Sequence, residues 1–265
     1  DDEKAALATR SSAWIRAFVT ETEPLTREPR ATRTPEGASI ERLDLAPFVI
    51  GKKINGLALG RGGSILAVVG DETAVLVDAQ TGLALRRLET TWRWGYDVAF
   101  SPDGTCVASV WHGGHVDVHD VTSGARRFAL EGGHSGVPNG VRSVAWSRDG
   151  ARLYTGGDDG RLVAWSLEGD APSIVWTVHE PGGFHAITTF ANGDVVASHV
   201  KTTGGESNWI ARFDGATGAV RERVETKTSI WAIAWRDDDT VATGGEDRLV
   251  RIADARKGLG ALVAS

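Results

Sequence analysis

The chain has 265 residues, 41% of which are hydrophobic, and it carries a formal net charge of −6. It is long enough for one large or two ordinary domains, and its mild acidity argues against binding to nucleic acid or to an anionic membrane. Cys106 is the single cysteine, so the fold contains no internal disulfide, which fits a reducing, cytoplasmic location. No apolar run approaches the roughly 18–20 residues of a membrane-spanning helix.

The first 38 residues differ from the rest of the chain and are expected to form a helix and a linker. Residues 1–20 begin with acids and carry spaced apolar side chains, which favours a helix, and "DDEKAALATR" lacks the pattern of a signal peptide. Residues 21–38 are rich in Pro, Thr and Arg and are expected to be the linker. From Ser39, the stretch "SIERLDLAPFVI" alternates like a strand.

Residues 39–265 are expected to form one repeat domain, because the chain resembles itself at a spacing of forty-odd residues. The clearest copy is "VRSVAWSRDGARLYTGGDDGRLVAWSLEG", which begins at Val141, and "IWAIAWRDDDTVATGGEDRLVRIADARKG" from Ile230 matches it well. Two further copies match moderately, and one matches loosely. The five repeats lie near residues 54–90, 95–130, 141–170, 184–224 and 230–265.

Each copy predicts a meander of four antiparallel strands. An alternating run such as Val141–Trp146 predicts a first strand with an apolar face, and a turn such as "SPDG" from Ser101 follows it. A second strand leads into a Gly-rich turn. The third strand ends at an Asp with a Gly four residues later, as in Asp78 and Gly82. The fourth strand is more polar, which suits the outer edge of a sheet.

Sheets of this kind can bury both faces only by stacking on one another around an axis, which predicts a propeller. The repeat length and the recurring Trp, Asp and Gly resemble the WD-repeat β-propeller family over roughly residues 50–265. The family's opening Gly-His occurs at Gly133-His134. Its closing Trp-Asp occurs in altered form, as in His119-Asp120 and Trp165-Ser166.

The resemblance implies a structural hydrogen-bond network in the third copy. In that network a turn Asp accepts from a His, which a Ser or Thr and a Trp indole hold in place, and such a network rigidifies a blade when every member is satisfied. The matching residues are His134, Thr155, Asp159 and Trp165. Asp71 and Asp247 match the Asp position in the first and fifth copies, where the His is missing.

The expected fold class is therefore all-β: a β-propeller of four-stranded antiparallel blades with five repeats and a short N-terminal helical extension. Two modes of closure stay open. The strand from Ser39 could form the outer strand of the last blade and clasp a closed ring. Alternatively, the chain could be an open arc completed by another chain, because an uncovered apolar blade face favours association.

The stretch "WHGGHVDVHD", from Trp111 to Asp120, contains three of the seven histidines. His115, Asp117 and His119 alternate along an expected strand, so they share one face and form a candidate metal site. The favoured interpretation is structural, because His119 occupies the position of Trp165 and would pack between blades. A pH response or a surface contact of the histidines is a further alternative. We expect no metal and no other cofactor.

One position near the start of the first strands is polar or aromatic, although the neighbouring positions are uniformly apolar or small. This variation indicates a surface position released from packing, and the resemblance implies that it opens onto the face commonly used for partners. Aromatic and Arg side chains are frequent in interface hot spots, whereas ordinary solvated loop ends are the alternative. The expected partner-binding face comprises Asn55, Trp94, Tyr96, Trp111, His112, Arg142, Asp158, His185, Trp231 and Glu246.

The sequence predicts a non-catalytic scaffold or sensor that presents a propeller face to a protein or peptide partner. A phosphate loop, a nucleophile elbow, a CxxC pair and HExxH are all absent from the sequence, so catalysis is not expected. One alternative is a structural subunit whose incomplete propeller is completed by another chain. Another is an enzymatic or small-molecule-binding propeller that uses the central funnel. The abundance of Arg, Ala and Gly indicates a bacterial source, where such propellers are often parts of larger assemblies.

Overall fold

The computed structural model describes most of the chain from residue 53 onward and one short strand pair before it. The described residues are 53–60, 62–135, 140–201, 207–235 and 240–263, with β1 (Thr32–Arg33) and β2 (Ser39–Ile40). Ser39–Ile40 pairs with Thr32–Arg33, so these two residues do not extend the last blade. The helix expected over residues 1–20 and the rest of the expected clasp, residues 41–50, lie outside the described residues.

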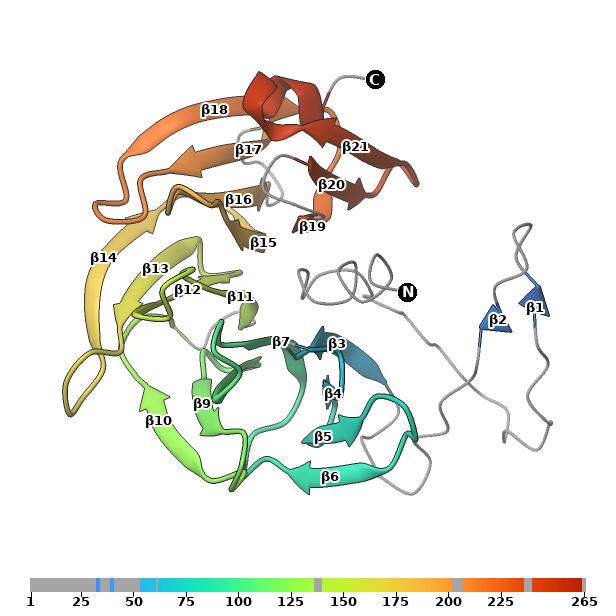
Figure 1. The fold of residues 1–265 in the computed structure, drawn as a ribbon. Helices are drawn as coiled ribbons and strands as arrows, with labels where there is room; N and C mark the ends of the chain where they lie inside the picture. The colour runs from blue at the N-terminus through green and yellow to red at the C-terminus, as the bar shows by residue number, and fades with distance from the viewer. Residues whose placement is uncertain are drawn as a thin grey trace.

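Five antiparallel sheets follow one another along the chain, and these are the blades (Figure 1). Blade 1 comprises β3 (Ile54–Leu59), β4 (Ile65–Gly70), β5 (Ala74–Asp78) and β6 (Ala84–Arg87), and blade 2 comprises β7 (Gly95–Phe100), β8 (Cys106–Trp111), β9 (Val116–Asp120) and β10 (Arg126–Leu130). Blade 3 comprises β11 (Val141–Trp146), β12 (Arg152–Gly157), β13 (Arg161–Ser166) and β14 (Ser173–His179), and blade 4 comprises β15 (Gly183–Thr189), β16 (Val195–Val200), β17 (Asn208–Phe213) and β18 (Val220–Thr226). Blade 5 comprises β19 (Ile230–Trp235), β20 (Thr240–Gly245) and β21 (Val250–Asp254).

The blades form an arc, with the first strand of each blade nearest the centre (Figure 1). These inner strands contact one another in the order β3, β7, β11, β15 and β19. In the described part of the chain, β19 and β3 make no comparable contact, so blades 1 and 5 are the two ends of the arc. The prediction of an all-β propeller with five repeats is confirmed. No helix among the described residues is long and apolar enough to cross a membrane.

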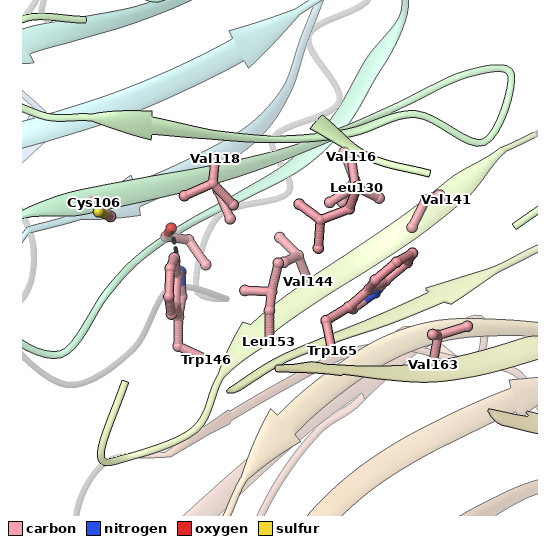
Figure 2. Close-up of a cluster of buried hydrophobic side chains, with 13 residues drawn as sticks. Cys106, Val116, Val118, Leu130, Val141, Val144, Trp146, Leu153, Val163 and Trp165 are labelled. Carbon is pink, nitrogen blue, oxygen red and sulfur yellow. Dashed lines mark hydrogen bonds between the residues drawn. The ribbon is translucent and has the colours of Figure 1, made fainter. Parts of the chain in front are cut away.

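Burial between neighbouring blades provides the core. Figure 2 shows the cluster between blades 2 and 3, where Val116 and Val118 of β9 pack with Leu153 and Trp165. Each of these four side chains is at most 2% exposed. Strand alternation places them on one face of each strand, and full burial of a side chain of this size contributes about 1.5–3 kcal/mol. Contact between blades therefore stabilises each blade.

Blade 5 differs from the other four blades at its outer edge. In register, Val250 and Ile252 of β21 correspond to Leu162 and Ala164 of blade 3. Leu162 and Ala164 are fully buried in the cluster shared with blade 4, whereas Val250 and Ile252 are 68% and 64% exposed. Within the described residues β21 has no fourth strand beside it, and the chain after Asp254 forms two 3-10 turns, η1 (Ala255–Lys257) and η2 (Leu259–Leu262).

The turn after the third strand uses the predicted Asp and Gly. The Asp78 carboxylate accepts the backbone N–H of Thr81 at 2.7 Å, and Gly82 follows with a φ of 70°. Asp120 and Gly124 repeat this arrangement in blade 2, where Gly124 has a φ of 74°. The hydrogen bond from Thr81 holds the pKa of Asp78 below its ordinary value. The acid fixes the turn, and glycine supplies the left-handed conformation without a Cβ clash.

Blade 3 contains four side chains joined by hydrogen bonds. Trp165 Nε1 donates to Thr155 Oγ1 at 2.8 Å, which leaves the Thr155 hydroxyl to donate to His134 Nε2, also at 2.8 Å. His134 Nδ1 then donates to Asp159 Oδ1 at 3.1 Å, and these two side chains are 1% and 5% exposed. Burial alone would raise the pKa of Asp159, but the hydrogen bonds from His134 and from the backbone N–H of Ser135 hold that pKa below its ordinary value. Every member of the network therefore has a partner.

His134→Ala should lower the free energy of unfolding by about 2–4 kcal/mol, because it leaves the buried Asp159 and Thr155 without their shared partner. Urea denaturation of the wild-type and variant proteins measures this difference. His179→Ala is the matched control, since His179 is exposed on the outer strand of the same blade. Equal stabilities of the two variants would contradict a structural role for the network.

Candidate partner-binding face

Every inner strand has a β-bulge near its start, and the same repeat position occupies each bulge. The register shifts lie between Ile54 and Gly56, Gly95 and Asp97, Val141 and Ser143, Phe184 and Ala186, and Ile230 and Ala232. The residues inside the shifts are Asn55, Tyr96, Arg142, His185 and Trp231, and all five are partly exposed. A bulge leaves its extra residue unpaired and redirects the side chain. This geometry explains why the position varies while its neighbours stay apolar.

Side chains from blades 2 to 5 form a continuous row of contacts along these bulges. The Arg142 guanidinium lies over the Tyr96 ring, 4.1 Å from the ring centroid, and its Nε donates to Asp158 Oδ2 at 2.5 Å. The other Asp158 oxygen lies 2.9 Å from His185 Nε2. The rings of His185 and Trp231 lie 4.9 Å apart between centroids. We call Tyr96, Arg142, Asp158, His185 and Trp231 the bulge row.

Asp158 organises the charges in the bulge row. Its burial would raise the pKa, but the hydrogen bond from His185 and the charge of Arg142 hold the pKa of Asp158 below its ordinary value. The carboxylate therefore stays ionised at neutral pH and orients both the guanidinium and the imidazole. Burial raises the pKa of Tyr96, so this phenol stays neutral. Side chains fixed in this way lose little conformational entropy when a partner binds.

Asp71 lies on this face, although the sequence placed it in a structural network. The backbone N–H of Asp71 donates to the carbonyl of Lys53 at 3.3 Å. In blade 3 the backbone N–H of Asp158 donates in the same way to the carbonyl of Gly140. Asn55 Nδ2 donates to Asp71 Oδ1, also at 3.3 Å. The prediction was wrong because Asp71 stands one position earlier in its turn than Asp159 does. The missed signal was the pairing of a bulge residue with a turn residue of the same repeat.

Asp247 does occupy the position of Asp159, and Arg251 contacts it where the His is missing. Arg251 Nη1 lies 2.6 Å from Asp247 Oδ2, and the backbone N–H of Leu249 donates to Oδ1 at 3.1 Å. The Leu249 bond is the main reason that the pKa of Asp247 lies below its ordinary value. The acid stabilises its own turn.

Trp94 and His112 extend the face over blade 2. The Trp94 N–H donates to the carbonyl of Asp71 at 2.7 Å, and the Trp94 carbonyl accepts from the His112 N–H at 2.9 Å. The two rings meet edge to face at 4.9 Å, and the Tyr96 hydroxyl lies 3.4 Å from His112 Nδ1. Trp94 is 52% exposed and has a φ of 56°. This left-handed conformation costs a residue with a Cβ about 1–2 kcal/mol.

Glu246 occupies the same turn position in blade 5. Its backbone N–H bonds to the Ser229 carbonyl at 3.0 Å, as the N–H of His112 does to the carbonyl of Trp94. The exposed Glu246 carboxylate accepts from Ser229 Oγ at 3.1 Å. The face therefore continues to the last blade.

Trp111 does not lie on this face. Its side chain is fully buried in the cluster between blades 1 and 2, where it packs with Val69 and Val98. Its Nε1 donates to Ser109 Oγ at 3.0 Å. The prediction of an exposed Trp111 was wrong because Gly95, its partner across the strand pair, leaves space for the ring: a Cβ there would lie 2.9 Å from it.

His115, just before the third strand of blade 2, and His119 within that strand have separate surroundings. The His115 ring stacks on the Trp92 ring with 3.4 Å between centroids, and burial lowers the pKa of His115. His119 is fully buried, and its Nε2 donates to the carbonyl of Glu89 at 2.6 Å. Among the residues that the structure describes, no three His, Cys, Asp or Glu side chains are arranged to hold a metal ion. The geometry therefore favours a packing role for His119.

Asp117 is the most unusual group in this strand. It is 1% exposed, and within the described residues neither carboxylate oxygen accepts a hydrogen bond of ordinary length. Arg126 Nη1 lies 3.6 Å from Oδ1. Burial raises the pKa of Asp117 to about 6, against the opposing effects of Arg126 and the Trp92 indole. Its position corresponds to Val163 of blade 3, which explains the apolar surroundings.

The fold and the network of blade 3 define a β-propeller of the WD type. Residues 127–166 and 220–254 match the model of the WD domain, G-beta repeat. Each match begins in the outer strand of one blade and ends at or near the end of the third strand of the next. With the five propeller blades, these matches show that the repeats they cover are similar to the WD repeat and that the fold is a β-propeller.

A curated relative is the 77 kDa echinoderm microtubule-associated protein of Strongylocentrotus purpuratus. It is 29% identical over 68 residues, which is 26% of this chain and 10% of the relative. The similarity thus covers a small part of each protein.

Asp117→Asn should change the pH dependence of stability in a defined direction. A carboxyl whose pKa is raised by folding destabilises the protein as pH rises from the unfolded value of 3.8 to about 6. The wild type should therefore lose up to about 3 kcal/mol between pH 4 and pH 7 from this group, and the variant should not. Urea denaturation at several pH values measures the difference.

Asp120→Asn is the control of opposite sign. Hydrogen bonds from Ser123 lower the pKa of Asp120, so its contribution is present at neutral pH and is lost as pH falls through the folded pKa. A pH profile of Asp117→Asn that parallels the wild-type profile would show that Asp117 does not titrate in this window.

Proposed function

We propose that the protein is a non-catalytic interaction module that presents the bulge row and the adjoining Trp94–His112 pair to a protein or peptide partner. The observation that carries this proposal is the Asp158-centred row, in which Arg142, His185 and two aromatic rings are preorganised on one face. Fixed aromatic and Arg side chains are the usual anchors of protein interfaces. We also propose a cytoplasmic location, because a chain with a single cysteine fits a reducing compartment.

The family comparison supports a binding role. WD-repeat propellers typically bind proteins and are generally not enzymes. The bulge supports the same role physically, since it leaves its residue outside the strand pairing and all five of these side chains partly exposed. His185 contacts Asp158 and Trp231, which orient it for recognition.

Tyr96→Ala, Arg142→Ala and Trp231→Ala should each weaken partner binding by roughly tenfold or more, because each removes an anchor of the row. Affinity capture from the source organism with immobilised wild-type protein identifies the partner, and titration calorimetry with that partner measures the affinities. Arg87→Ala is the matched control for Arg142→Ala, since Arg87 is exposed on the outer strand β6. Unchanged affinity in all three face variants would rule out the proposal.

The exposed edge of blade 5 favours a second candidate function, that of a structural subunit completed by another chain. Val250 and Ile252 are exposed at positions that are buried in blade 3, and β21 has no outer strand within the described residues. Unpaired strand edges and exposed apolar side chains both favour association. A partner that adds a strand here would bury both.

Val250→Lys and Ile252→Lys separate the two candidates. If another chain completes the arc, these variants should lose the captured partner, whereas Arg142→Ala should retain it. In sedimentation experiments with the partner present, the wild-type protein should also have an apparent mass above its monomer mass of 28.1 kDa. Retention of the partner by both lysine variants would exclude the completed-arc function.

A further inference from the structure

Trp94 stands at the repeat position just before the first strand of its blade, where blade 3 has little room for a side chain. The corresponding residues in blades 1, 3, 4 and 5 are Lys53, Gly140, Gly183 and Ser229. A Cβ on Gly140 would come within 2.8 Å of the Cα of His112, in the turn of the preceding blade. A bulky aromatic side chain is therefore the exception at this position, where the other blades have Lys, Gly or Ser.

Trp94 is also held in a left-handed backbone conformation. Its φ is 56°, and both backbone polar groups are fixed, the N–H by Asp71 and the carbonyl by His112. Glycine and asparagine adopt this conformation readily, whereas a bulky aromatic residue is strained there. Strained residues in native structures concentrate at functional sites.

The strain is not compensated by burial of the indole. Trp94 is 52% exposed, although a fold gains from a Trp side chain mainly by burying it. The ring contacts the His112 imidazole edge to face, which limits its movement. The result is a protruding, preoriented apolar ring beside the bulge row.

We propose that Trp94 is the anchor of the partner-binding face and receives an apolar side chain of a partner peptide segment. This inference rests on the proposed function and names the residue that contributes most to it. An apolar contact is favoured because the indole is exposed and rigid, and such rings are the usual hot spots of interfaces. The net charge of −6 disfavours nucleic acid and anionic lipid as occupants.

Arg248 provides a matched control for the strain. It is the other non-glycine residue with positive φ among those described, at 66°, and it is exposed in the turn of blade 5. Replacing either residue by glycine relieves the same kind of backbone strain. Only the replacement of Trp94 should affect binding.

The test uses a displayed library of random peptides selected on the full-length wild-type protein. Enriched peptides should share an apolar residue, and they should bind Trp94→Gly at least roughly tenfold more weakly than the wild type or Arg248→Gly. Trp94→Asn, which also tolerates the left-handed conformation, should give the same result. Trp94→Gly should melt no lower than the wild type.

Each other outcome overturns the inference in a distinguishable way. If peptides lose affinity for Arg142→Ala but bind Trp94→Gly normally, the proposed function stands and the anchor assignment fails. If neither variant affects binding, or if no peptide is enriched, both fail. A melting temperature of Trp94→Gly more than about 4 °C below wild type would show that the indole stabilises the fold. A parallel titration with single-stranded oligonucleotides tests the other occupant. If they bind the wild type but not Trp94→Gly, the ring serves base stacking instead.

Discussion

A four-stranded antiparallel blade has two apolar faces, and only a neighbouring blade can bury them. This constraint explains why the repeat recurs and why the interior positions are so uniform from copy to copy. It also explains the difference at the end of the arc, where Val250 and Ile252 remain exposed and no further blade follows within the described residues. The same apolar pattern that stabilises the interior blades makes the terminal blade prone to association with another apolar surface.

The bulge at the start of each inner strand separates packing from recognition. On either side of the bulge the strand keeps its ladder and its apolar contacts, while the extra residue is released from the ladder. Polar side chains next to the bulge join the blades: Ser143 Oγ donates to Asp97 Oδ2 at 2.9 Å and accepts the N–H of Ile187 at 3.2 Å. The frame around the face is therefore held by hydrogen bonds that are distinct from those within the bulge row.

The repeats, most strands and the turns could be predicted from the sequence because they depend on local features: alternation, and the preference of Asp and Gly for particular turn conformations. The errors depend on non-local contacts. The turn position of Asp71 is set by its bond to Lys53, and the burial of Trp111 by the absence of a side chain on Gly95. The residues after Asp254 form 3-10 turns, so within the described part of the chain they add no fourth strand to blade 5. The contacts within the bulge row required the spatial neighbours of each bulge.

The repeated bulge also has a consequence for engineering and for evolutionary change. Each of the five blades contributes one residue to the same face from a position whose replacement leaves the ladder hydrogen bonds intact. These positions can therefore be randomised together as a combinatorial library, with the scaffold unchanged and new specificities selected directly. Divergent copies of such a gene could acquire different ligands by a few codon changes at these sites.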